Sequence, residues 1–288
     1  MTPFADVPDP PLIGIGDNCI DHYLPPIDRR FAGGNVLNVV ANWLSHGVPA
    51  RYAGSIGDDP DGGLIRSALQ TLGDDGRYLQ VVPGASTGVS TIAVTSEGEP
   101  LFVEEVYGVS GEPPLTPALL DYLRRVRPLV HLSTNGQALR VAQALADTGA
   151  ELSCDFGYHL AEMAEAERRD LLARLDYAFL SAGDALSDEA VDALAASIAA
   201  DGPRVVLVGR GALGVRGVFA GTQVSAPPWT AASPLDSLGA GDALIAGVLA
   251  SITEGGSVAR HLQRGLQWAA EACTHLGAFR LPTKKWGI

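Results

Sequence analysis

The chain lacks the features of a secreted, membrane-spanning or nucleic-acid-binding protein. No run of about twenty apolar residues occurs, and a membrane-spanning helix needs that length. Residues 1–11 carry acids and prolines without a basic segment before an apolar run, so we expect no signal peptide. Because 33 Asp and Glu residues outnumber 20 Lys and Arg residues, the net charge is −13 and no basic stripe is present. Nucleic acid and anionic membranes are therefore not expected as partners.

Cysteine is also scarce, which excludes a disulfide framework. The three cysteines, Cys19, Cys154 and Cys273, are odd in number, scattered, and without the spacing of metal ligands. They are typical of thiols in a reducing compartment, so the sequence predicts a soluble cytoplasmic protein. The histidines lack metal-ligand spacing as well, and we expect no histidine-based metal site.

What the chain does contain is a regular alternation of helical and strand-like segments. With 288 residues, 47% of them hydrophobic, it can bury a sizeable core as one α/β domain over 1–288. The predicted strands are 12–16, 129–133, 151–155, 176–181 and 204–208. The predicted helices are 33–46, 116 onward, 137–147, 161–175, 187–200, 240 onward and 257–276. This order implies a mostly parallel central sheet with helices on both faces.

Polar residues follow the first strand and line the first helix. Asp17 and Asn18 end the strand, where open α/β sheets place ligands, although a plain strand-end turn would use the same residues. In the helix, Asn35, Asn38 and Asn42 recur at positions i, i+3 and i+7 and share one stripe. A row of amides suits a polyhydroxylated ligand. We expect ligand contact for Asn38 and a surface position for Asn42.

A hairpin is predicted in the first half of the chain. Segments 86–95 and 101–107 are rich in β-forming residues and flank the turn 96–99. Two interpretations stay open here: a separate β element, or an edge hairpin of the main sheet.

The segment 233–242 carries the strongest chemical signal. Gly239, Ala240 and Gly241 leave no bulky side chain over the first turn of the following helix, whose free N–H groups suit a phosphate. Asp242 lies in that turn and could take a proton from an attacking hydroxyl. The alternative for Asp242 is a simple partner of the helix dipole.

Two motifs resemble those of a known family. Residues 236–242, Asp-Ser-Leu-Gly-Ala-Gly-Asp, resemble the Asp-Thr-x-Gly-Ala-Gly-Asp signature of the ribokinase-like (PfkB) carbohydrate kinases. Gly33, Gly34 and Asn38 are similar to that family's Gly-Gly-x-x-x-Asn signature. Segments 15–21, 31–39 and 54–63 are most similar to its bacterial fructoselysine 6-kinase branch, and the resemblance spans nearly the whole chain.

The resemblance implies ATP-dependent phosphorylation of a primary hydroxyl of a small sugar, such as fructoselysine or another fructosamine. It implies a ribokinase-like fold with a β lid from about 86–107, in which Thr87–Thr91 and Glu104–Tyr107 lie nearest the substrate and through which a homodimer forms. Asp242 would be the base, assisted by Gly239, Ala240 and Gly241. The residues implied to contact the sugar are Asp17, Asn18, Gly33, Gly34, Asn35 and Asn38.

For the nucleotide and metals, the resemblance implies ATP, Mg²⁺ and a monovalent cation such as K⁺. Asp155 matches a position near the transferred phosphate, Asp184 is the candidate magnesium residue, and Asp236 is the candidate for the monovalent cation. The residues implied to contact the nucleotide are Gly209, Arg210, Gly211, Leu238, Gly241 and His275. The chain departs from the family pattern at Ser181, Asp184, Leu207 and Ala212, which puts the metal and nucleotide contacts in doubt.

Other functions stay open at this point. One is a kinase for another sugar, a sugar acid or a nucleoside. Another is a non-catalytic relative that senses a sugar or nucleotide, although the presence of Asp242 argues against it. A Rossmann dehydrogenase is disfavoured, because Gly14-Ile15-Gly16 is not followed by a third glycine at the required spacing.

Overall fold

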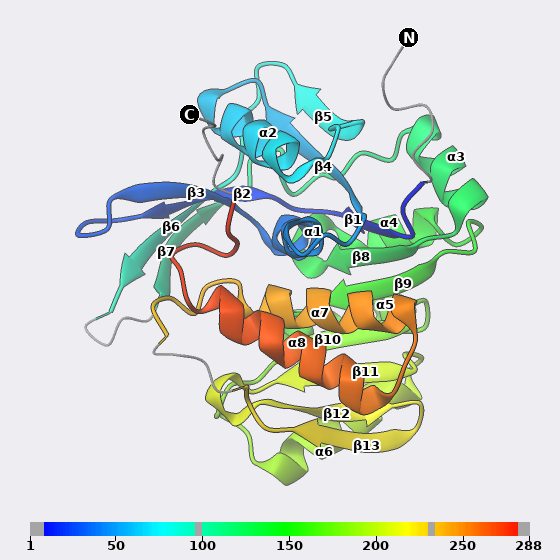
Figure 1. The fold of residues 1–288 in the computed structure, drawn as a ribbon. Coiled ribbons are helices and arrows are strands. Elements are labelled where there is room, and N and C mark those ends of the chain that lie inside the picture. Colours follow the sequence, from blue (N-terminus) through cyan, green and yellow to red (C-terminus); the bar gives the residue numbers. More distant parts are fainter. Residues whose placement is uncertain (1–8, 96–99, 230–233, 282–288) are drawn as a thin grey trace.

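The computed structural model describes residues 9–95, 100–229 and 234–281, and arranges their strands in two sheets (Figure 1). The larger sheet has nine strands in the order β13-β12-β11-β10-β9-β8-β1-β4-β5. Its strands are β1 (Leu12–Ile15), β4 (Arg51–Gly57), β5 (Tyr78–Val82), β8 (Leu129–Ser133), β9 (Glu151–Asp155), β10 (Tyr177–Ser181), β11 (Val205–Gly209), β12 (Val215–Phe219) and β13 (Thr222–Ala226). All neighbours pair in parallel except β11–β12 and β12–β13, which form an antiparallel edge.

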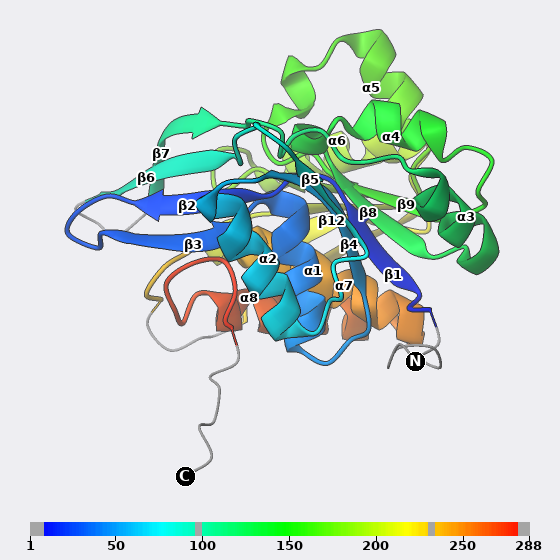
Figure 2. The same cartoon turned by 90° about the horizontal axis from the view of Figure 1, so that it is seen from above.

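Helices cover both faces of this sheet (Figure 2). One face carries α1 (Asn35–Ser45), α2 (Pro60–Leu72), α7 (Ala240–Glu254) and α8 (Val258–Ala272). The other carries α3 (Pro117–Val126), α4 (Ala138–Ala144), α5 (Glu165–Leu172) and α6 (Asp188–Ala200). The sheet therefore separates two apolar cores, each closed by four helices.

Alternation along the strands supplies both cores. In β11, Val206 and Val208 pack into the core under α3–α6, whereas Val205 and Leu207 pack into the core under α1, α2, α7 and α8. Successive side chains of a strand point to opposite faces, so a continuous apolar strand is buried on both sides. This explains why the predicted strands read as unbroken apolar runs.

The second sheet has four strands in the order β3-β2-β6-β7 and projects from the main body (Figure 1). We call it the small sheet; its strands are β2 (Cys19–Tyr23), β3 (Arg29–Gly33), β6 (Val89–Val94) and β7 (Pro100–Val106). The predicted hairpin 86–107 is thus half of a separate sheet, and its interpretation as an edge of the main sheet is wrong. Its expected turn, 96–99, lies outside the described residues.

The topology confirms the predicted α/β class and shows what was missed. The predicted helices and strands after residue 116 are present with small shifts, and Thr116 caps α3 as expected, with Pro117 in its first turn. Strands β2, β3, β5, β12 and β13 were not predicted, and β4 and α2 also lie outside the ranges predicted for strands and helices. The sequence also predicted one helix over 161–175, whereas the structure has a 3₁₀ turn at His159–Glu162 and a shorter α5.

The strand order places the site. The chain runs from β1 to its neighbour β4 on one side and later returns to β8 on the other side of β1. Open α/β sheets bind ligands outside the carboxyl ends of the strands where the order reverses. Here those ends carry Asp17 after β1, Asn135 after β8 and Asp155 on β9.

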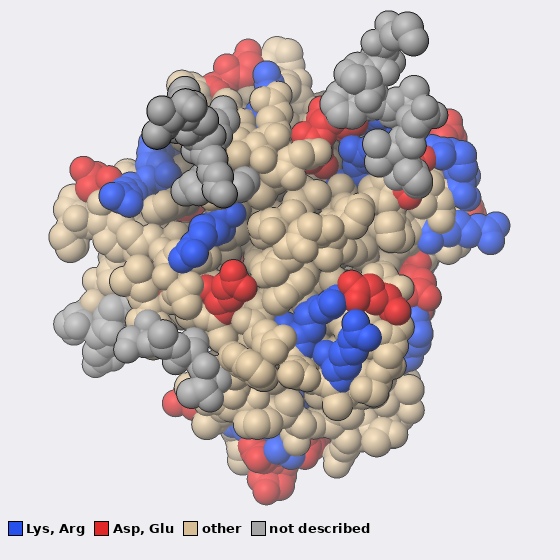
Figure 3. Space-filling model, in the orientation of Figure 1, with Lys and Arg blue, Asp and Glu red and all other residues tan. Residues whose placement is uncertain are grey.

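The surface agrees with the absence of a basic stripe in the sequence. On the described part of the face in Figure 3, acidic and basic side chains form small mixed groups and no continuous basic area. Within the described ranges, none of the helices combines the length and the apolar character that a bilayer crossing requires.

Candidate active site

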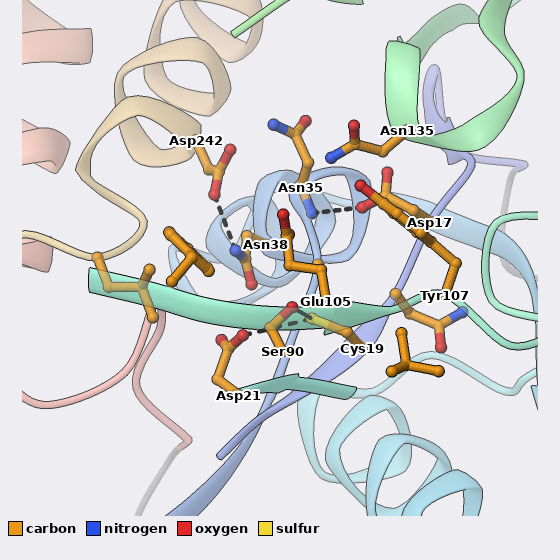
Figure 4. Close-up of a pocket in the computed structure, with 15 residues that line it drawn as sticks. Asp17, Cys19, Asp21, Asn35, Asn38, Ser90, Glu105, Tyr107, Asn135 and Asp242 are labelled. Carbon is orange, nitrogen blue, oxygen red and sulfur yellow. Dashed lines mark hydrogen bonds between the residues drawn. The ribbon is translucent and has the colours of Figure 1, made fainter. Parts of the chain in front are cut away.

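A cavity of about 150 Å³ lies where the small sheet meets the carboxyl ends of β1 and β8 and the first turns of α1 and α7 (Figure 4). Asp242 enters it from α7, and Asn35 and Asn38 enter it from α1. The lining residues are Asp17, Asn18, Cys19, Asp21, Gly34, Asn35, Asn38, Ser90, Phe102, Glu105, Val106, Tyr107, Asn135, Leu238 and Asp242. Seven predicted site residues are among them: Asp17, Asn18, Gly34, Asn35, Asn38, Leu238 and Asp242.

Asp17 lies directly after β1 and receives the first N–H groups of α1. The Asn35 backbone N–H donates to one carboxylate oxygen at 2.8 Å, and that of Val36 donates to the other at 3.4 Å. A carboxylate at this position satisfies otherwise free amides and the positive end of the helix dipole. Asp17 thus has a structural role as well as a place in the cavity.

Gly33 and Gly34 allow β3 to pass close over β2 before α1 begins. A Cβ on Gly33 would lie 2.0 Å from a carboxylate oxygen of Asp21. A Cβ on Gly34 would lie 2.4 Å from the Asn18 Cα, and Gly34 has a φ of +104°, which favours glycine. Gly33 does not line the cavity, so it affects the site only indirectly, by letting β3 lie close to β2.

Three asparagines that line the cavity use the donor groups of their side chains within the protein. Asn18 donates to the Tyr52 hydroxyl and the Ser55 carbonyl, both at 2.9 Å. Asn35 donates to Asp155 at 2.7 Å, and Asn38 donates to Asp242 at 2.8 Å. All three Oδ1 atoms are buried and accept no hydrogen bond from the described residues. The cavity therefore presents acceptors and requires donors from a ligand.

Asn42 was expected at the surface, and that prediction is wrong. It is buried, and its amide donates to the backbone carbonyl of Asn38 at 2.9 Å. Asn38 and Asn42 are buried because α7 packs along α1, with the Trp43 indole donating to the Ala246 carbonyl at 2.9 Å, whereas Asn35 at the start of α1 is half-buried.

Asp242 lies in the first turn of α7, as predicted. No side chain caps this helix, whose N-cap is Gly239 in the left-handed conformation. Its first turn therefore presents backbone N–H groups beside the carboxylate, an arrangement that suits a phosphate.

The two glycine positions of this turn differ in whether the surrounding structure requires glycine. Gly239 has a φ of +77°, and a Cβ there would lie 2.5 Å from the Ala278 Cβ. Gly241 has open space where a Cβ would point. The structure therefore requires glycine at 239, whereas at 241 only a ligand over the turn would require it.

Several buried carboxyl groups lie at or near this cavity, and none of the lining side chains is cationic. Burial raises the pKa values of Asp17, Asp155 and Asp242, with that of Asp242 held well above its usual range. The negative charges of Asp155, Asp17 and Asp21 add to the effect on the pKa of Asp242, and the Asn38 hydrogen bond opposes it. No Lys or Arg is among the lining residues. An electropositive partner is therefore needed for these carboxyl groups to be ionised together.

Asp21 is the most perturbed carboxyl group of the small sheet. It is 3% exposed, and burial raises its pKa to about 7. The Cys19 thiol, 3.3 Å away, is its hydrogen-bond donor and lowers this pKa, while Asp236, Glu105 and Asp17 raise it through their charges. Sequence reasoning did not select Asp21, because β2 was not predicted.

The residues predicted to bind the nucleotide do not all gather in one place. Gly209 ends β11, Arg210 and Gly211 follow that strand, and Asp184 lies exposed after β10. The Arg210 side chain, 5% exposed, pairs with Asp188 and donates to the backbone carbonyls of Gly183 and Leu186. Its guanidinium is engaged within the protein, which does not support the predicted contact with a nucleotide phosphate.

The Asp236 carboxylate stabilises its loop through hydrogen bonds within the protein, so it is not a free ligand for a cation. Its carboxylate accepts hydrogen bonds from the Tyr23 hydroxyl at 2.5 Å and from the backbone N–H groups of Gly277 and Leu238 at 2.9 and 3.0 Å. These contacts join β2, the segment after α8 and the start of α7.

His275 lines a different cavity, near the ends of α1, α2 and α8, together with Asn42 and His46. It lies apart from the residues that surround Asp242, and we do not retain it as a nucleotide contact.

Several residues that line the cavity were not predicted from the sequence, or were predicted only as part of a longer segment. Ser90, Glu105, Val106 and Tyr107 lie within the segments expected nearest the substrate. Asn135 follows β8, and its polar position at a strand end was a usable signal. Cys19, Asp21 and Phe102 depend on the pairing of the small sheet, which no local pattern indicates.

Comparisons with known proteins agree with this arrangement. A family model described as pfkB family carbohydrate kinase matches residues 28–284. Fructoselysine 6-kinase of Escherichia coli (strain K12) is 27% identical, covering 93% of this chain and 99% of that protein. ATP-dependent ribose-1-phosphate kinase of Halopiger xanaduensis is 29% identical, covering 88% and 84%. The structure of Arabidopsis thaliana ribokinase with ribose and ATP superposes with a TM-score of 0.76 at 23% identity, covering 93% and 94%.

The two glycines before Asp242 give a test of the local geometry. We expect Gly239→Ala to lower the free energy of unfolding by about 1–3 kcal/mol, because its φ and its contact with Ala278 exclude a side chain. Gly241→Ala is the matched control and should leave stability within about 1 kcal/mol of the parent. Urea unfolding of the three proteins measures the difference; equal stabilities would contradict the assigned contact.

A second test concerns the buried carboxyl of Asp21. Its pKa in the fold, about 7, lies above the 3.8 of an unperturbed aspartate, so its contribution to stability is present at low pH and is lost as pH rises toward 7. We therefore expect the parent to lose stability between pH 4 and 7 relative to Asp21→Asn. Unfolding curves across this range measure the difference, and a constant gap would show that Asp21 is not protonated in the fold.

Proposed function

Since the chain belongs to the pfkB family of carbohydrate kinases and is an ATP-dependent sugar kinase, we propose that it phosphorylates the primary hydroxyl of a small sugar bound in the cavity at Asp242. The observation that carries this proposal is the placement of the Asp242 carboxylate beside the uncapped first turn of α7 and over an acceptor-lined cavity. A base, a phosphate cradle and a hydroxyl-binding pocket then meet at one point.

Asp242 is proposed to take the proton of the attacking hydroxyl. The hydroxyl oxygen forms a bond to the γ-phosphorus, the bond from that phosphorus to the oxygen bridging to the β-phosphate breaks, and ADP leaves. Burial raises the pKa of Asp242, which makes its carboxylate a stronger proton acceptor. The hydrogen bond from Asn38 fixes the carboxylate and favours its ionised form.

The backbone N–H groups of Gly239, Ala240 and Gly241 are proposed to stabilise charge on the transferred phosphoryl group. They lie at the uncapped end of a fifteen-residue helix, whose dipole favours negative charge there; the N–H group of Ala240 also donates to the Ser237 carbonyl at 3.2 Å. The open space above Gly241 leaves room for this group.

ATP brings Mg²⁺ to such a site. The described residues hold no cluster of three or more metal-ligating side chains, which fits an ion held mainly by nucleotide phosphates with one or two carboxylates. Asp155 is the buried carboxylate beside Asn35 that best suits this role, whereas Asp184 is exposed. A monovalent cation near residue 236 stays a prediction, with loop carbonyls as its ligands because the Asp236 carboxylate already accepts three hydrogen bonds.

For the nucleotide, we retain the backbone of Gly209 and Gly211 after β11, together with Leu238 and Gly241. Leu238 lines the cavity beside Asp242, so a nucleotide approaching the first turn of α7 would pass it. A cytoplasmic location likewise stays a prediction.

For the sugar, we propose fructoselysine or another fructosamine, with phosphorylation at the 6-hydroxyl. The support is the fructoselysine 6-kinase relative, which this chain covers almost completely, and a cavity whose free asparagine oxygens suit hydroxyl donors. Asp17, Asn18, Gly34, Asn35 and Asn38 would contact the sugar.

We also propose that the small sheet acts as a lid over the sugar and pairs two subunits. Strand β7 is at its edge and exposes Leu101, Phe102 and Val103, an unusual density of apolar side chains for a monomer surface. Size-exclusion chromatography with light scattering should therefore give the mass of a dimer. Leu101→Glu should produce monomer, and a monomeric parent protein would contradict the pairing.

The test of the reaction is Asp242→Asn. We expect this variant to keep the fold and nucleotide binding but to lose about a hundredfold or more in turnover, because the proton acceptor is gone. The measurement is ADP release from ATP and Mg²⁺ with fructoselysine, fructose, ribose, 2-keto-3-deoxygluconate and adenosine. Circular dichroism and ATP titration are the controls, and near-parental turnover would rule out the base role.

A further inference from the structure

We propose that Asp21 and Glu105, on either side of Ser90 in the small sheet, form a subsite for an ammonium group and so select a cationic sugar. This inference deepens the proposed sugar kinase function and depends on it. It differs in assigning charge selection to two residues that take no part in the phosphoryl transfer.

The register of the small sheet places the three side chains in one row. Asp21 of β2 pairs with Ser90 of β6, and Ser90 pairs with Glu105 of β7. Directly paired residues on neighbouring strands point to the same face, with the strands about 4.8 Å apart. All three line the cavity, so this face is the one toward the substrate (Figure 4).

The row is free to take a ligand, in contrast to the other carboxylates. Asp17 accepts two N–H groups of α1, and Asp242 accepts the Asn38 amide. The hydrogen bond to Asp21 comes from the Cys19 thiol, a weak donor. Glu105 makes neither a hydrogen bond nor an ion pair with the described part of the chain.

The surroundings point independently to a donor-rich, positively charged ligand. The Oδ1 atoms of Asn18 and Asn38, residues 2% and 5% exposed, lie at the same cavity without donors from the described residues. Four lining carboxyl groups, at positions 17, 21, 105 and 242, face no lining Lys or Arg. A neutral sugar would satisfy the amide oxygens but leave these charges unbalanced, whereas an ammonium group would satisfy both.

A metal ion is a less suitable occupant. No group of three or more His, Cys, Asp or Glu side chains in the described residues is arranged to hold one. Two carboxylates separated by a serine, with a thiol as their neighbour, match an ammonium group with several N–H donors more closely. The same row would repel a sugar that carries a phosphate or carboxylate at that end.

The experiment uses three substrates with the same ring and the same 6-hydroxyl that differ only at carbon 1. They are 1-amino-1-deoxyfructose, fructose and fructose 1-phosphate. For the parent protein we expect kcat/KM to fall in this order, with on the order of a tenfold step from amine to hydroxyl and a larger step to phosphate.

Two variants test whether Asp21 and Glu105 cause this preference for the amine. Glu105→Gln and Asp21→Asn should each remove most of the preference for the amine, chiefly through a higher KM for 1-amino-1-deoxyfructose. Glu104→Gln is the matched control, because it removes the same charge from a neighbouring position of β7 that does not line the cavity. This control should keep the parental preference.

The outcomes separate the two proposals. If the parent phosphorylates none of the three while Asp242→Asn is equally silent, the sugar proposal fails first. If the parent uses fructose or fructose 1-phosphate with a kcat/KM equal to or above that for the amine, the ammonium subsite is wrong and the kinase function stands. If Glu105→Gln, an exposed substitution that should fold, keeps the full preference for the amine, Glu105 has no part in it.

Discussion

The hydrogen bond between the Asn38 amide and the Asp242 carboxylate joins the two helices on which the site depends. Helix α1 begins where Asp17 accepts its first N–H groups, and α7 begins at Gly239 without a side-chain cap. Because α1 and α7 pack along each other, with Trp43 bonded to the Ala246 carbonyl, their first turns are held at the same cavity. One turn presents amide oxygens to a sugar, and the other presents N–H groups and a carboxylate to a phosphate.

The cost of this arrangement is a concentration of negative charge. Asp17, Asp21, Asp155 and Asp242 all have raised pKa values because they are buried, the charges of neighbouring carboxyl groups add to the effect at Asp21 and Asp242, and no lining residue is cationic. Magnesium and a cationic substrate would supply the positive charge and the N–H donors that these groups lack within the protein.

Sequence reasoning reached the parts of the molecule that local patterns encode. The apolar strands, Thr116 before Pro117, the glycine-rich turn before Asp242 and the asparagine stripe are visible as periodicity or as turn chemistry, and the structure contains them. Only half of the small sheet could be predicted from local patterns: β2 and β3 are short and polar in places, and they are strands because β2 pairs with β3 on one side and with β6 on the other. Asp21 and Glu105 therefore became candidates only when the register brought them together. Likewise, Asn42 looked exposed by its residue type, but its burial depends on α7, which lies two hundred residues later in the chain.

The segment after β11, predicted to contact the nucleotide, is held by contacts within the protein, because Arg210 pairs with Asp188 and donates to two backbone carbonyl groups. Nothing in the structure explains Leu207 or Ala212 in terms of the nucleotide. The central claim is that one cavity aligns a sugar hydroxyl with Asp242 and a phosphate with the first turn of α7. A crystal structure with fructoselysine and a non-hydrolysable ATP analogue tests it most directly. The account predicts the 6-hydroxyl within hydrogen-bond distance of Asp242 and the γ-phosphate at the amides of Gly239–Gly241; a sugar bound with that hydroxyl away from Asp242 would contradict it.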